Sequence, residues 1–178
     1  MQFYRNNFES QKAESFITDR LQAENNFVIC VKRAGETAEM VYESTSAKQT
    51  AQFAAELAKT AAPGMIICLE GDLGVGKTVF TQGFARGLGI VEPVSSPTFT
   101  IVQVYEEGRL PLYHFDVYRI ADVMEMEEIG YEDYFYGQGV CLVEWSSRIS
   151  EILPEQVLSV RIEKDLERDF DFRRIIVE

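Results

Sequence analysis

One short stretch constrains this chain more than any other. Gly71-Asp72-Leu73-Gly74-Val75-Gly76-Lys77-Thr78 fits the phosphate-binding loop pattern G-x-x-x-x-G-K-[ST] at every fixed position. Its glycines allow a tight turn that brings backbone N–H groups up to a phosphate. Lys77 supplies a charge for the outer phosphates, and the Thr78 hydroxyl is suited to binding Mg²⁺. The predicted nucleotide-binding segment runs from Leu73 through Gly74, Val75, Gly76, Lys77 and Thr78 to Val79.

The residues on either side of the loop support this interpretation. Residues 65–69 form a short apolar run, typical of a buried strand, and residues 79–88 are predicted to form a helix closed by Gly87 and Gly89. The N-terminus of that helix would direct its partial positive charge and free N–H groups at the phosphates. The alternative, a glycine-rich surface turn, does not account for a strand before the loop and a helix after it. The chain is therefore predicted to bind a nucleoside triphosphate.

Length and composition bound the remaining classes. A chain of 178 residues fits one domain with a substantial core. No run approaches the roughly 18 apolar residues that a membrane span needs, and the N-terminus lacks an apolar signal core. The three cysteines lie far apart, which favours reduced, buried thiols over disulfides or a zinc site. We therefore expect a cytoplasmic protein without a membrane partner.

The net charge of −12 bears on partners. Nucleic-acid binding depends mainly on basic side chains that neutralise phosphates, and this chain has the opposite sign overall. Direct, stable binding of tRNA or DNA by this chain alone is therefore not expected.

The chain is expected to divide near residue 40. Residues 1–40 are predicted to be an N-terminal extension of unknown role, with a weakly amphipathic helix over 12–22, a strand over 27–31 and a turn over 34–36. Residues 41–178 are predicted to be the P-loop ATPase domain. Ser46 and Gln49 form a capping box before a helix over 47–61. Further elements are expected as strands over 40–43, 101–105, 110–116, 140–144, 157–162 and 170–177, and a short helix over 122–129 capped by Gly130.

This order of elements predicts the fold class. Strand–helix–strand order around a phosphate loop indicates an α/β, three-layer P-loop NTPase-like fold with a mixed central β-sheet. The strands over 101–105 and 110–116 are expected to form an added antiparallel hairpin. The tail is expected to contribute two more strands. The nucleotide is expected at the C-terminal edge of the sheet.

Hydrolysis also requires a bound metal and an oriented water, so a carboxylate is needed at the end of a neighbouring strand. Glu144 ends the run 140–143, whose lack of alternation predicts a strand buried on both faces. The alternative is a solvated acid that leaves the strand, and it is the less favoured because Trp145 follows at once. Glu144 is therefore the preferred metal ligand.

Asp116 is the second candidate acid, at the end of Tyr113-His114-Phe115. It is placed to bind Mg²⁺ through water or to orient the attacking water. An ordinary surface ion pair with Arg119 explains its position equally well from spacing alone.

The remaining polar positions have functional and structural interpretations side by side. Ser96 and Thr98 follow the loop–helix unit, where a switch segment senses a γ-phosphate through hydroxyl contacts, but hydroxyls beside a proline also form local turns. His114 is favoured as a packed strand histidine over a catalytic base, without being settled. An aromatic group is interpreted as core and rim packing: Tyr131, Tyr134, Phe135, Tyr136 and Trp145.

Several segments together resemble a known family. After the loop come Ser96-Pro97-Thr98-Phe99-Thr100, Tyr113-His114-Phe115-Asp116-Val117-Tyr118-Arg119 and Leu142-Val143-Glu144-Trp145. In this order and spacing they resemble the TsaE (YjeE) family of bacterial P-loop ATPases, over about residues 42–177. The loop alone is widely shared, but the combination is specific. Members usually begin close to Tyr42, so residues 1–40 depart from the pattern.

The resemblance implies a role in making threonylcarbamoyladenosine, a modified adenosine beside the anticodon of tRNA. It implies an Mg²⁺-dependent ATPase, weak without partner proteins, that acts with a TsaB–TsaD-type complex and resets it between turnovers. The tRNA would be held by those partners and only indirectly by this chain, in agreement with the acidic composition.

Carried onto matching positions, the resemblance implies roles for individual residues. Lys77 would hold the phosphates and serve catalysis, and Thr78 and Glu144 would coordinate Mg²⁺. Asp116 would serve catalysis at the metal, which favours it over the ion-pair interpretation. The nucleotide-sensing switch would contain Ser96 and Thr98, and the adenosine would lie near Ser46, Thr50 and Arg168.

Three other functions remain open from the sequence. A small-molecule P-loop kinase usually needs an arginine-bearing lid, and no arginine-rich lid is evident. A GTP-dependent switch typically carries an [NT]-K-x-D segment, which this chain lacks. Nucleotide binding with negligible hydrolysis in isolation is the third.

Overall fold

The structure is a computed structural model that describes residues 30–32 and 39–178. The predicted helix over 12–22, the turn over 34–36 and residues 27–29 of the predicted strand lie outside the described residues. No helix in the described part of the chain is both long and apolar enough to cross a bilayer.

The strands are β1 (Cys30–Lys32), β2 (Glu39–Ser44), β3 (Ile66–Glu70), β4 (Val102–Tyr105), β5 (Leu112–Asp116), β6 (Val140–Glu144), β7 (Leu158–Lys164) and β8 (Arg173–Val177). The helices are α2 (Ala47–Ala58), α3 (Lys77–Leu88), α4 (Met124–Glu128), α5 (Tyr131–Phe135) and the 3₁₀ helix η1 (Ser146–Ile149).

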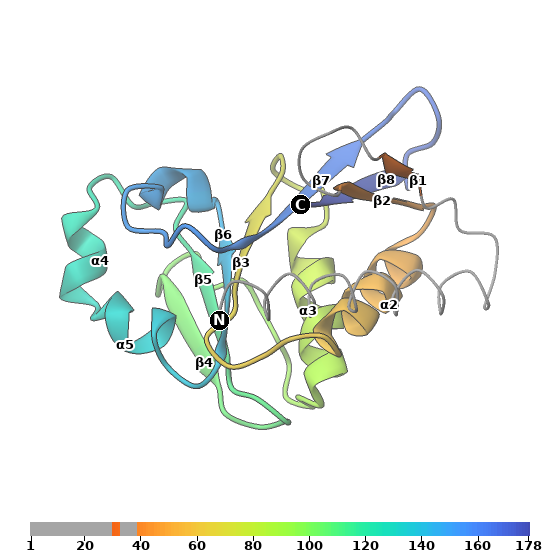
Figure 1. Cartoon of the computed structure of the whole chain (residues 1–178). Helices are drawn as coiled ribbons and strands as arrows, with labels where there is room; N and C mark the ends of the chain where they lie inside the picture. The colour runs from red at the N-terminus through yellow and green to blue at the C-terminus, as the bar shows by residue number, and fades with distance from the viewer. Residues whose placement is uncertain (1–29, 33–38) are drawn as a thin grey trace.

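All described strands join in one mixed sheet, in the order β1-β2-β8-β7-β3-β6-β5-β4 (Figure 1). The strands β5, β6, β3 and β7 run parallel through its centre. Both flanks are antiparallel, through the hairpin pairs β4–β5 and β7–β8 and through β2, which pairs with β8 and β1. The predicted mixed sheet with added hairpins is confirmed.

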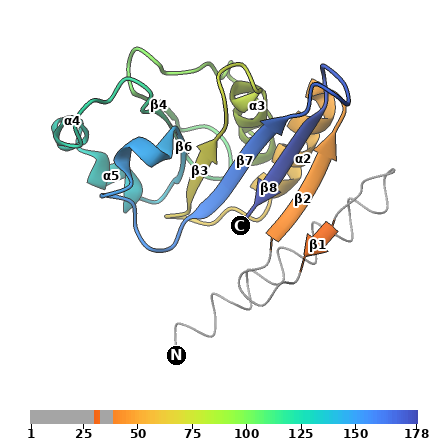
Figure 2. The same cartoon turned by 90° about the horizontal axis from the view of Figure 1, so that it is seen from above.

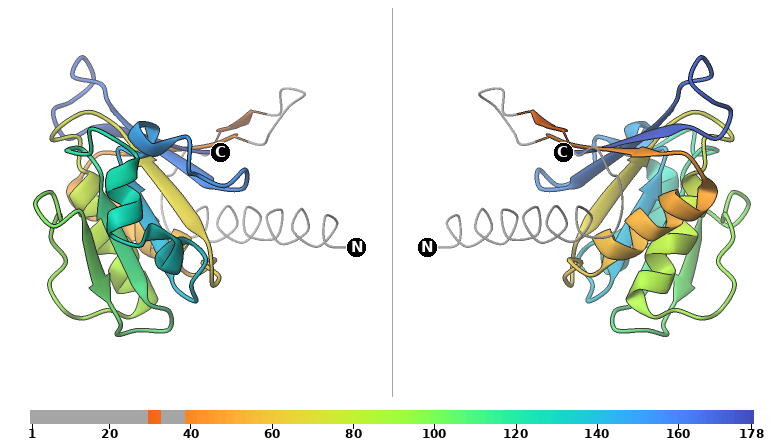
Figure 3. Two further views of the ribbon diagram at one scale, coloured as in Figure 1. Left: turned by 90° about the vertical axis from the view of Figure 1, so that its left-hand side faces the viewer. Right: turned by 90° about the vertical axis from the view of Figure 1, so that its right-hand side faces the viewer.

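Helices α2 and α3 cover one face of the sheet, side by side (Figures 2 and 3). They approach closely because small residues meet: a Cβ added at Gly83 would lie 2.3 Å from the Ala51 carbonyl oxygen, and one at Gly87 would lie 2.4 Å from that of Ala55. Contacts this short do not occur between real side chains and backbone, so glycine is required at both positions. The buried core between these helices and the sheet includes Phe53, Phe80, Phe84, Leu69 and Leu142.

The shorter helices α4, α5 and η1 cover the opposite face, as Figure 2 shows. Aromatic rings fill this layer: the Phe115 ring meets Tyr134 and Phe135 edge-on, with centroids 5.6 and 5.7 Å apart. Tyr131 packs edge-on against Phe135 at 5.2 Å. Packing is thus confirmed for Tyr131, Tyr134 and Phe135, whereas Tyr136 is 67% exposed, and Trp145 has a second contact described below.

Strand alternation decides which side chains face which layer. On β5, Phe115 belongs to the aromatic layer, while Leu112 belongs to the core under α2 and α3. His114 and Asp116 share the side of Leu112, and on β6 Glu144 shares the side of Leu142. The strand ends that carry Asp116 and Glu144 therefore point both acids toward the layer that holds the phosphate loop.

Three local expectations are corrected. Helix α2 ends at Ala58, with Lys59 as its C-cap, rather than at residue 61. Ser46 caps it by accepting a bond from the Gln49 N–H, but the Gln49 side chain bonds Thr45 and so does not complete the capping box. Helix α4 begins at Met124 rather than at residue 122, whereas Gly130, with φ of 66°, follows its C-cap as predicted and is also the N-cap of α5.

Candidate nucleotide site

The loop Gly71–Thr78 connects β3 to α3, as predicted from the sequence. Gly74 and Gly76 have φ of 70° and 111°, in the left-handed region that glycine adopts without steric cost. A Cβ added at Gly76 would meet nothing within 4 Å, and one at Gly74 would meet only the Lys164 Nζ, at 3.9 Å. Both glycines thus line an open concavity at the N-terminus of α3, where free N–H groups and the helix dipole favour an anion.

Lys77 supplies the positive charge beside the loop glycines, and it is only 6% exposed. Its Nζ donates to the carbonyl oxygens of Gly71 and Asp72, at 2.7 and 3.1 Å, and lies 3.9 Å from the centroid of the Trp145 ring. Burial lowers the pKa of this ammonium below its usual value, while the nearby carboxylates of Glu144 and Asp116 act in the opposite direction. The ammonium is therefore held beside two acids.

Those two acids lie level with each other at the ends of neighbouring parallel strands. Asp116 on β5 pairs in register with Glu144 on β6, and they are 4% and 3% exposed. Buried carboxylates are costly unless they are paired or bind a metal. Both acids thus stand at the C-terminal ends of their strands.

Asp116 does not form the surface ion pair that the sequence left open. Its Oδ2 accepts bonds from the hydroxyls of Ser96, at 2.7 Å, and Thr98, and its Oδ1 accepts from the Tyr118 N–H at 3.1 Å. Arg119 instead lies over the Phe99 ring, 4.4 Å from its centroid. The predicted switch residues are thus tied to the predicted catalytic acid in this structure.

Glu144 contacts the one histidine of the sequence. Its Oε1 lies 2.9 Å from the Nε2 of His114, whose side chain is fully buried. The His114 Nδ1 is buried with no hydrogen-bond partner. His114 is thus a buried strand histidine, as favoured from the sequence, and among the described residues its one side-chain hydrogen bond is to Glu144.

A small cavity of about 60 Å³ lies beside the loop, at the N-terminus of α2. Thr50, Val75, Gly76 and Val79 line it, together with Ala47, Asp171 and Arg173. The Thr50 hydroxyl is buried and bonds that of Ser44 at 2.9 Å. Ser46, the N-cap of α2, stands next to this lining, whereas Arg168 pairs with Glu43 at 2.8 Å and lies over Phe172.

The residues present fit a nucleotide phosphate and a divalent cation. The concavity at Gly74 and Gly76 is lined by backbone N–H groups and one ammonium, which suits phosphate oxygens. The hydroxyl of Thr78 and the carboxylates of Asp116 and Glu144 supply the oxygen ligands that Mg²⁺ prefers. No described residue hydrogen-bonds the Thr78 hydroxyl. Groups of three or more His, Cys, Asp or Glu that could hold a metal ion are not found among the described residues.

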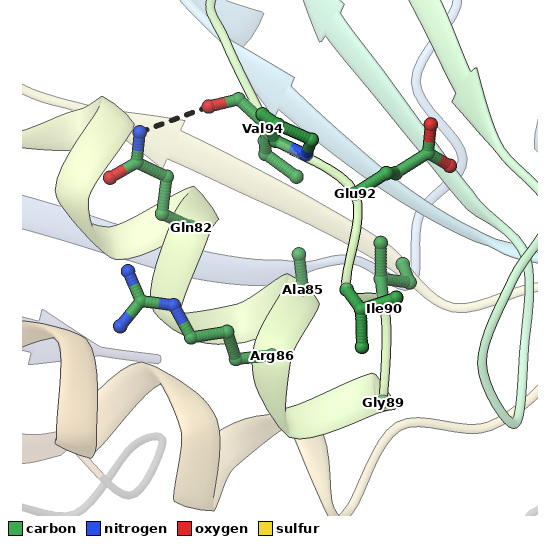
Figure 4. Close-up of a pocket in the computed structure, with 9 residues that line it drawn as sticks. Gln82, Ala85, Arg86, Gly89, Ile90, Glu92 and Val94 are labelled. Atoms are coloured by element: carbon green, nitrogen blue, oxygen red, sulfur yellow. Dashed lines mark hydrogen bonds between the residues drawn. The ribbon is translucent and has the colours of Figure 1, made fainter.

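A much larger hollow lies elsewhere. It measures about 500 Å³ and follows the second half of α3 and the loop after it (Figure 4). Gln82 closes one side by donating to the Val94 carbonyl oxygen at 2.9 Å, and Arg86 and Glu92 extend from its walls. No residue of the phosphate loop or of the acid pair lines it, so size alone would have indicated the wrong place.

Comparisons with known proteins agree with this geometry. The family profile described as threonylcarbamoyl adenosine biosynthesis protein TsaE matches residues 44–174. The chain belongs to the TsaE family. It is 48% identical over 139 residues to the tRNA threonylcarbamoyladenosine biosynthesis protein TsaE of Bacillus subtilis, covering 77% of this chain and 87% of that protein. The TsaE protein of Treponema pallidum is 43% identical over 119 residues, covering 67% of this chain and 87% of the relative.

A solved structure gives the same result for the fold. The crystal structure of Bacillus subtilis YdiB superposes with a TM-score of 0.68 at 42% identity, covering 81% of this chain and 87% of that one. TsaE proteins are P-loop ATPase-like proteins of tRNA modification, so membership favours the main interpretation over a metabolite kinase or a GTP switch.

Three site residues were missed or left open by sequence reasoning. The contact of His114 with Glu144 could have been inferred, because His114 precedes Asp116 by two and so shares its face. Trp145 over Lys77 could not, since it depends on a left-handed turn at Trp145, with φ of 63°. Arg173, which donates to the Val75 carbonyl oxygen at 2.6 Å, carries no sequence signal for a role at the loop.

Proposed function

We propose that this protein is an Mg²⁺-dependent ATPase that acts in the threonylcarbamoyladenosine modification of tRNA, together with a TsaB–TsaD-type complex. The observation that carries the hydrolytic part is the level pair of buried acids, Asp116 and Glu144, beside the loop lysine. A site that only bound nucleotide would not require a second buried carboxylate next to the metal ligand. The proposed pathway is supported by the relatives, which are tRNA threonylcarbamoyladenosine biosynthesis proteins, and the proposed partners by the resemblance to the family.

Each residue has a role that its position allows. Lys77 would hold the outer phosphates of ATP, and Thr78 with Glu144 would hold Mg²⁺. The bound metal would neutralise charge that builds up on the transferred phosphoryl group. Asp116 would orient the attacking water, and Ser96 and Thr98 would act as the switch by exchanging their bonds to Asp116 for contacts near the γ-phosphate. The adenosine would occupy the side of the loop near Ser46 and Thr50, with Arg168 at its edge.

The surface around the loop suits a protein partner. Leu73 on the loop and Phe99 on the switch segment are 80% and 85% exposed. Exposed large apolar side chains next to a functional site are typical of protein contacts. With tRNA held by its partners, the protein would work in the cytoplasm. We further propose that residues 41–178 are the ATPase domain and residues 1–40 an extension to it, as the family match begins at residue 44.

The test is ATP turnover with and without the TsaB–TsaD-type complex of the same organism, combined with an assay of tRNA modification. Lys77→Ala and Glu144→Ala should each lower turnover by about 10²- to 10³-fold and abolish modification. Lys59→Ala and Glu128→Ala, at positions away from the loop, are matched controls that should leave both unchanged. Wild-type hydrolysis by Lys77→Ala would exclude the assigned site. Nucleotide binding without turnover, even with partners present, would support the binding-only alternative.

A further inference from the structure

Glu70 is an acidic residue at the same edge of the sheet as the candidate site, and the proposed reaction does not use it. It is the last residue of β3 and directly precedes the phosphate loop. In the parallel pairing of β3 with β6, Leu69 lies opposite Glu144, so Glu70 comes level with the turn that follows Glu144. The Trp145 N–H donates to the Leu69 carbonyl oxygen at 3.3 Å, which keeps the two strand ends together at this point.

The Glu70 carboxylate is bonded to that turn. Its Oε1 accepts from the Ser146 hydroxyl at 2.7 Å and from the Ser147 N–H at 2.8 Å. Ser146 is 3% exposed, so its hydroxyl has little access to water as an alternative partner. One carboxylate oxygen of β3 thus holds the first two residues of η1, the short helix that begins directly after Trp145.

The turn needs such support because its conformation is unfavourable. Trp145 has φ of 63° and ψ of 34°, the left-handed region that a bulky side chain rarely adopts. Conformations of this kind persist only where surrounding contacts fix them. Here two hydrogen bonds to one carboxylate oxygen act on the residues that follow the strained one.

The turn also determines what lies against the loop lysine. The Trp145 ring lies 3.9 Å from the Lys77 Nζ and packs at 5.0 Å from the Tyr118 ring. The same turn follows Glu144 directly, so a change in its path would move both the ring and the carboxylate. We propose that Glu70 is a positioning residue of this site: by holding the Trp145–Ser146 turn, it sets the indole ring over the Lys77 ammonium and keeps Glu144 directed at the loop.

The variants separate hydrogen bonding from charge. Glu70→Ala removes the acceptor, whereas Glu70→Gln keeps an amide oxygen that can accept both bonds and removes only the charge. Ser146→Ala removes one donor and leaves Glu70 in place, which gives a milder change if Glu70→Ala folds poorly. Trp145 is the sole tryptophan of the sequence, so tryptophan emission reports on this turn without any added probe.

In Glu70→Ala, the emission of Trp145 should move to longer wavelength and become more accessible to acrylamide, because the half-buried ring loses its place. In Glu70→Gln both should stay near wild type. Since the proposal rests on the proposed ATPase function, turnover is a second readout: kcat should fall about 10- to 100-fold in Glu70→Ala, with a smaller change in KM, and recover in Glu70→Gln.

Unchanged emission in Glu70→Ala and Ser146→Ala would overturn the proposal whatever the activity. A Glu70→Gln protein as impaired as Glu70→Ala would also overturn it, because the charge and not the hydrogen bonds would then matter. Absence of turnover in the wild-type protein with its partners would reject the proposed function alone, and the emission of the variants would still decide whether Glu70 holds the turn.

Discussion

The two faces of the central sheet are built from the same strands, but their side chains differ in kind and in what they contact. On β5, Phe115 packs into the aromatic layer under α4 and α5, while its neighbour Asp116 faces the layer of α3 and bonds Ser96 and Thr98. On β6, Cys141 and Val143 belong to the aromatic layer, whereas Glu144 faces the phosphate loop. On β5 and β6, one face of the sheet carries apolar side chains, and the other ends in buried carboxylates.

The covering helices differ in the same way. On the site face, α2 and α3 approach through Gly83 and Gly87, so the contact is between backbones and leaves α3 little freedom to shift. On the other face, rings meet edge-on across gaps of 5 to 6 Å between centroids. The aromatic face is thus closed by side-chain packing, while the α3 face holds the loop in a fixed position at some cost in buried charge.

The strongest test of this division compares adjacent residues of β5. Phe115→Ala should lower the free energy of unfolding by about 3–5 kcal/mol, because a fully buried ring leaves a cavity between α5 and the sheet. Asp116→Asn should leave stability within about 1 kcal/mol, since an amide oxygen can still accept the hydroxyl bonds, yet it should lower ATP turnover strongly. Urea unfolding and turnover per folded molecule measure the two effects.

A Phe115→Ala protein that keeps its stability would contradict the assignment of this ring to a closely packed aromatic layer. If it instead loses turnover far beyond its unfolded fraction, the two faces are coupled and the division fails.

The fold was predictable because its signals are local. A continuous apolar run predicts the buried strand at β6, glycines at 87 and 89 predict the end of α3, and the loop pattern determines where β3 and α3 meet. The hairpin β4–β5 followed from two runs around a glycine turn. Short helices were less predictable, because α4 and α5 have only five residues each, and Gly130 serves equally well as an end or a beginning.

The site was predictable only in part. The loop pattern predicted Lys77, and the buried strand favoured Glu144. Asp116 stayed level with an ion pair to Arg119 until the family resemblance favoured it. The partners of these residues depend on register and on backbone conformation. The Ser96 and Thr98 bonds to Asp116 and the Trp145 ring over Lys77 arise from turns that no residue pattern specifies.

The contact between His114 and Glu144 gives a second test, on the face of the sheet that carries the phosphate loop. His114→Leu should raise the Mg²⁺ concentration for half-maximal ATP turnover by about 10- to 100-fold, because Glu144 loses the partner that orients it. The free energy of unfolding should also fall, by about 1–3 kcal/mol, because the buried Glu144 carboxylate loses its hydrogen-bond partner. An Mg²⁺ titration of turnover, with partners present, measures the shift.

Gln103→Ala is the matched control, because Gln103 lies opposite His114 on the edge strand β4 and is exposed. It should leave the Mg²⁺ dependence unchanged. An unchanged Mg²⁺ dependence in His114→Leu would show that Glu144 does not need His114 to orient it.

The smallest expected effect concerns Cys141 and tests whether water reaches the aromatic face. Burial raises the pKa of this thiol to about 12. The folded protein therefore keeps the Cys141 proton at pH values where the unfolded chain, with an ordinary thiol pKa near 8.5, has lost it. The unfolded state is then favoured as the pH rises, so this stabilisation is fully present below about pH 8 and declines above it. Between pH 8 and 10, the free energy of unfolding should fall by about 1–2 kcal/mol more in the wild type than in Cys141→Ala. Equal slopes in urea unfolding at the two pH values would mean that water reaches the thiol, and that the aromatic face is not the closed apolar layer that the packing of Phe115 and Tyr134 indicates.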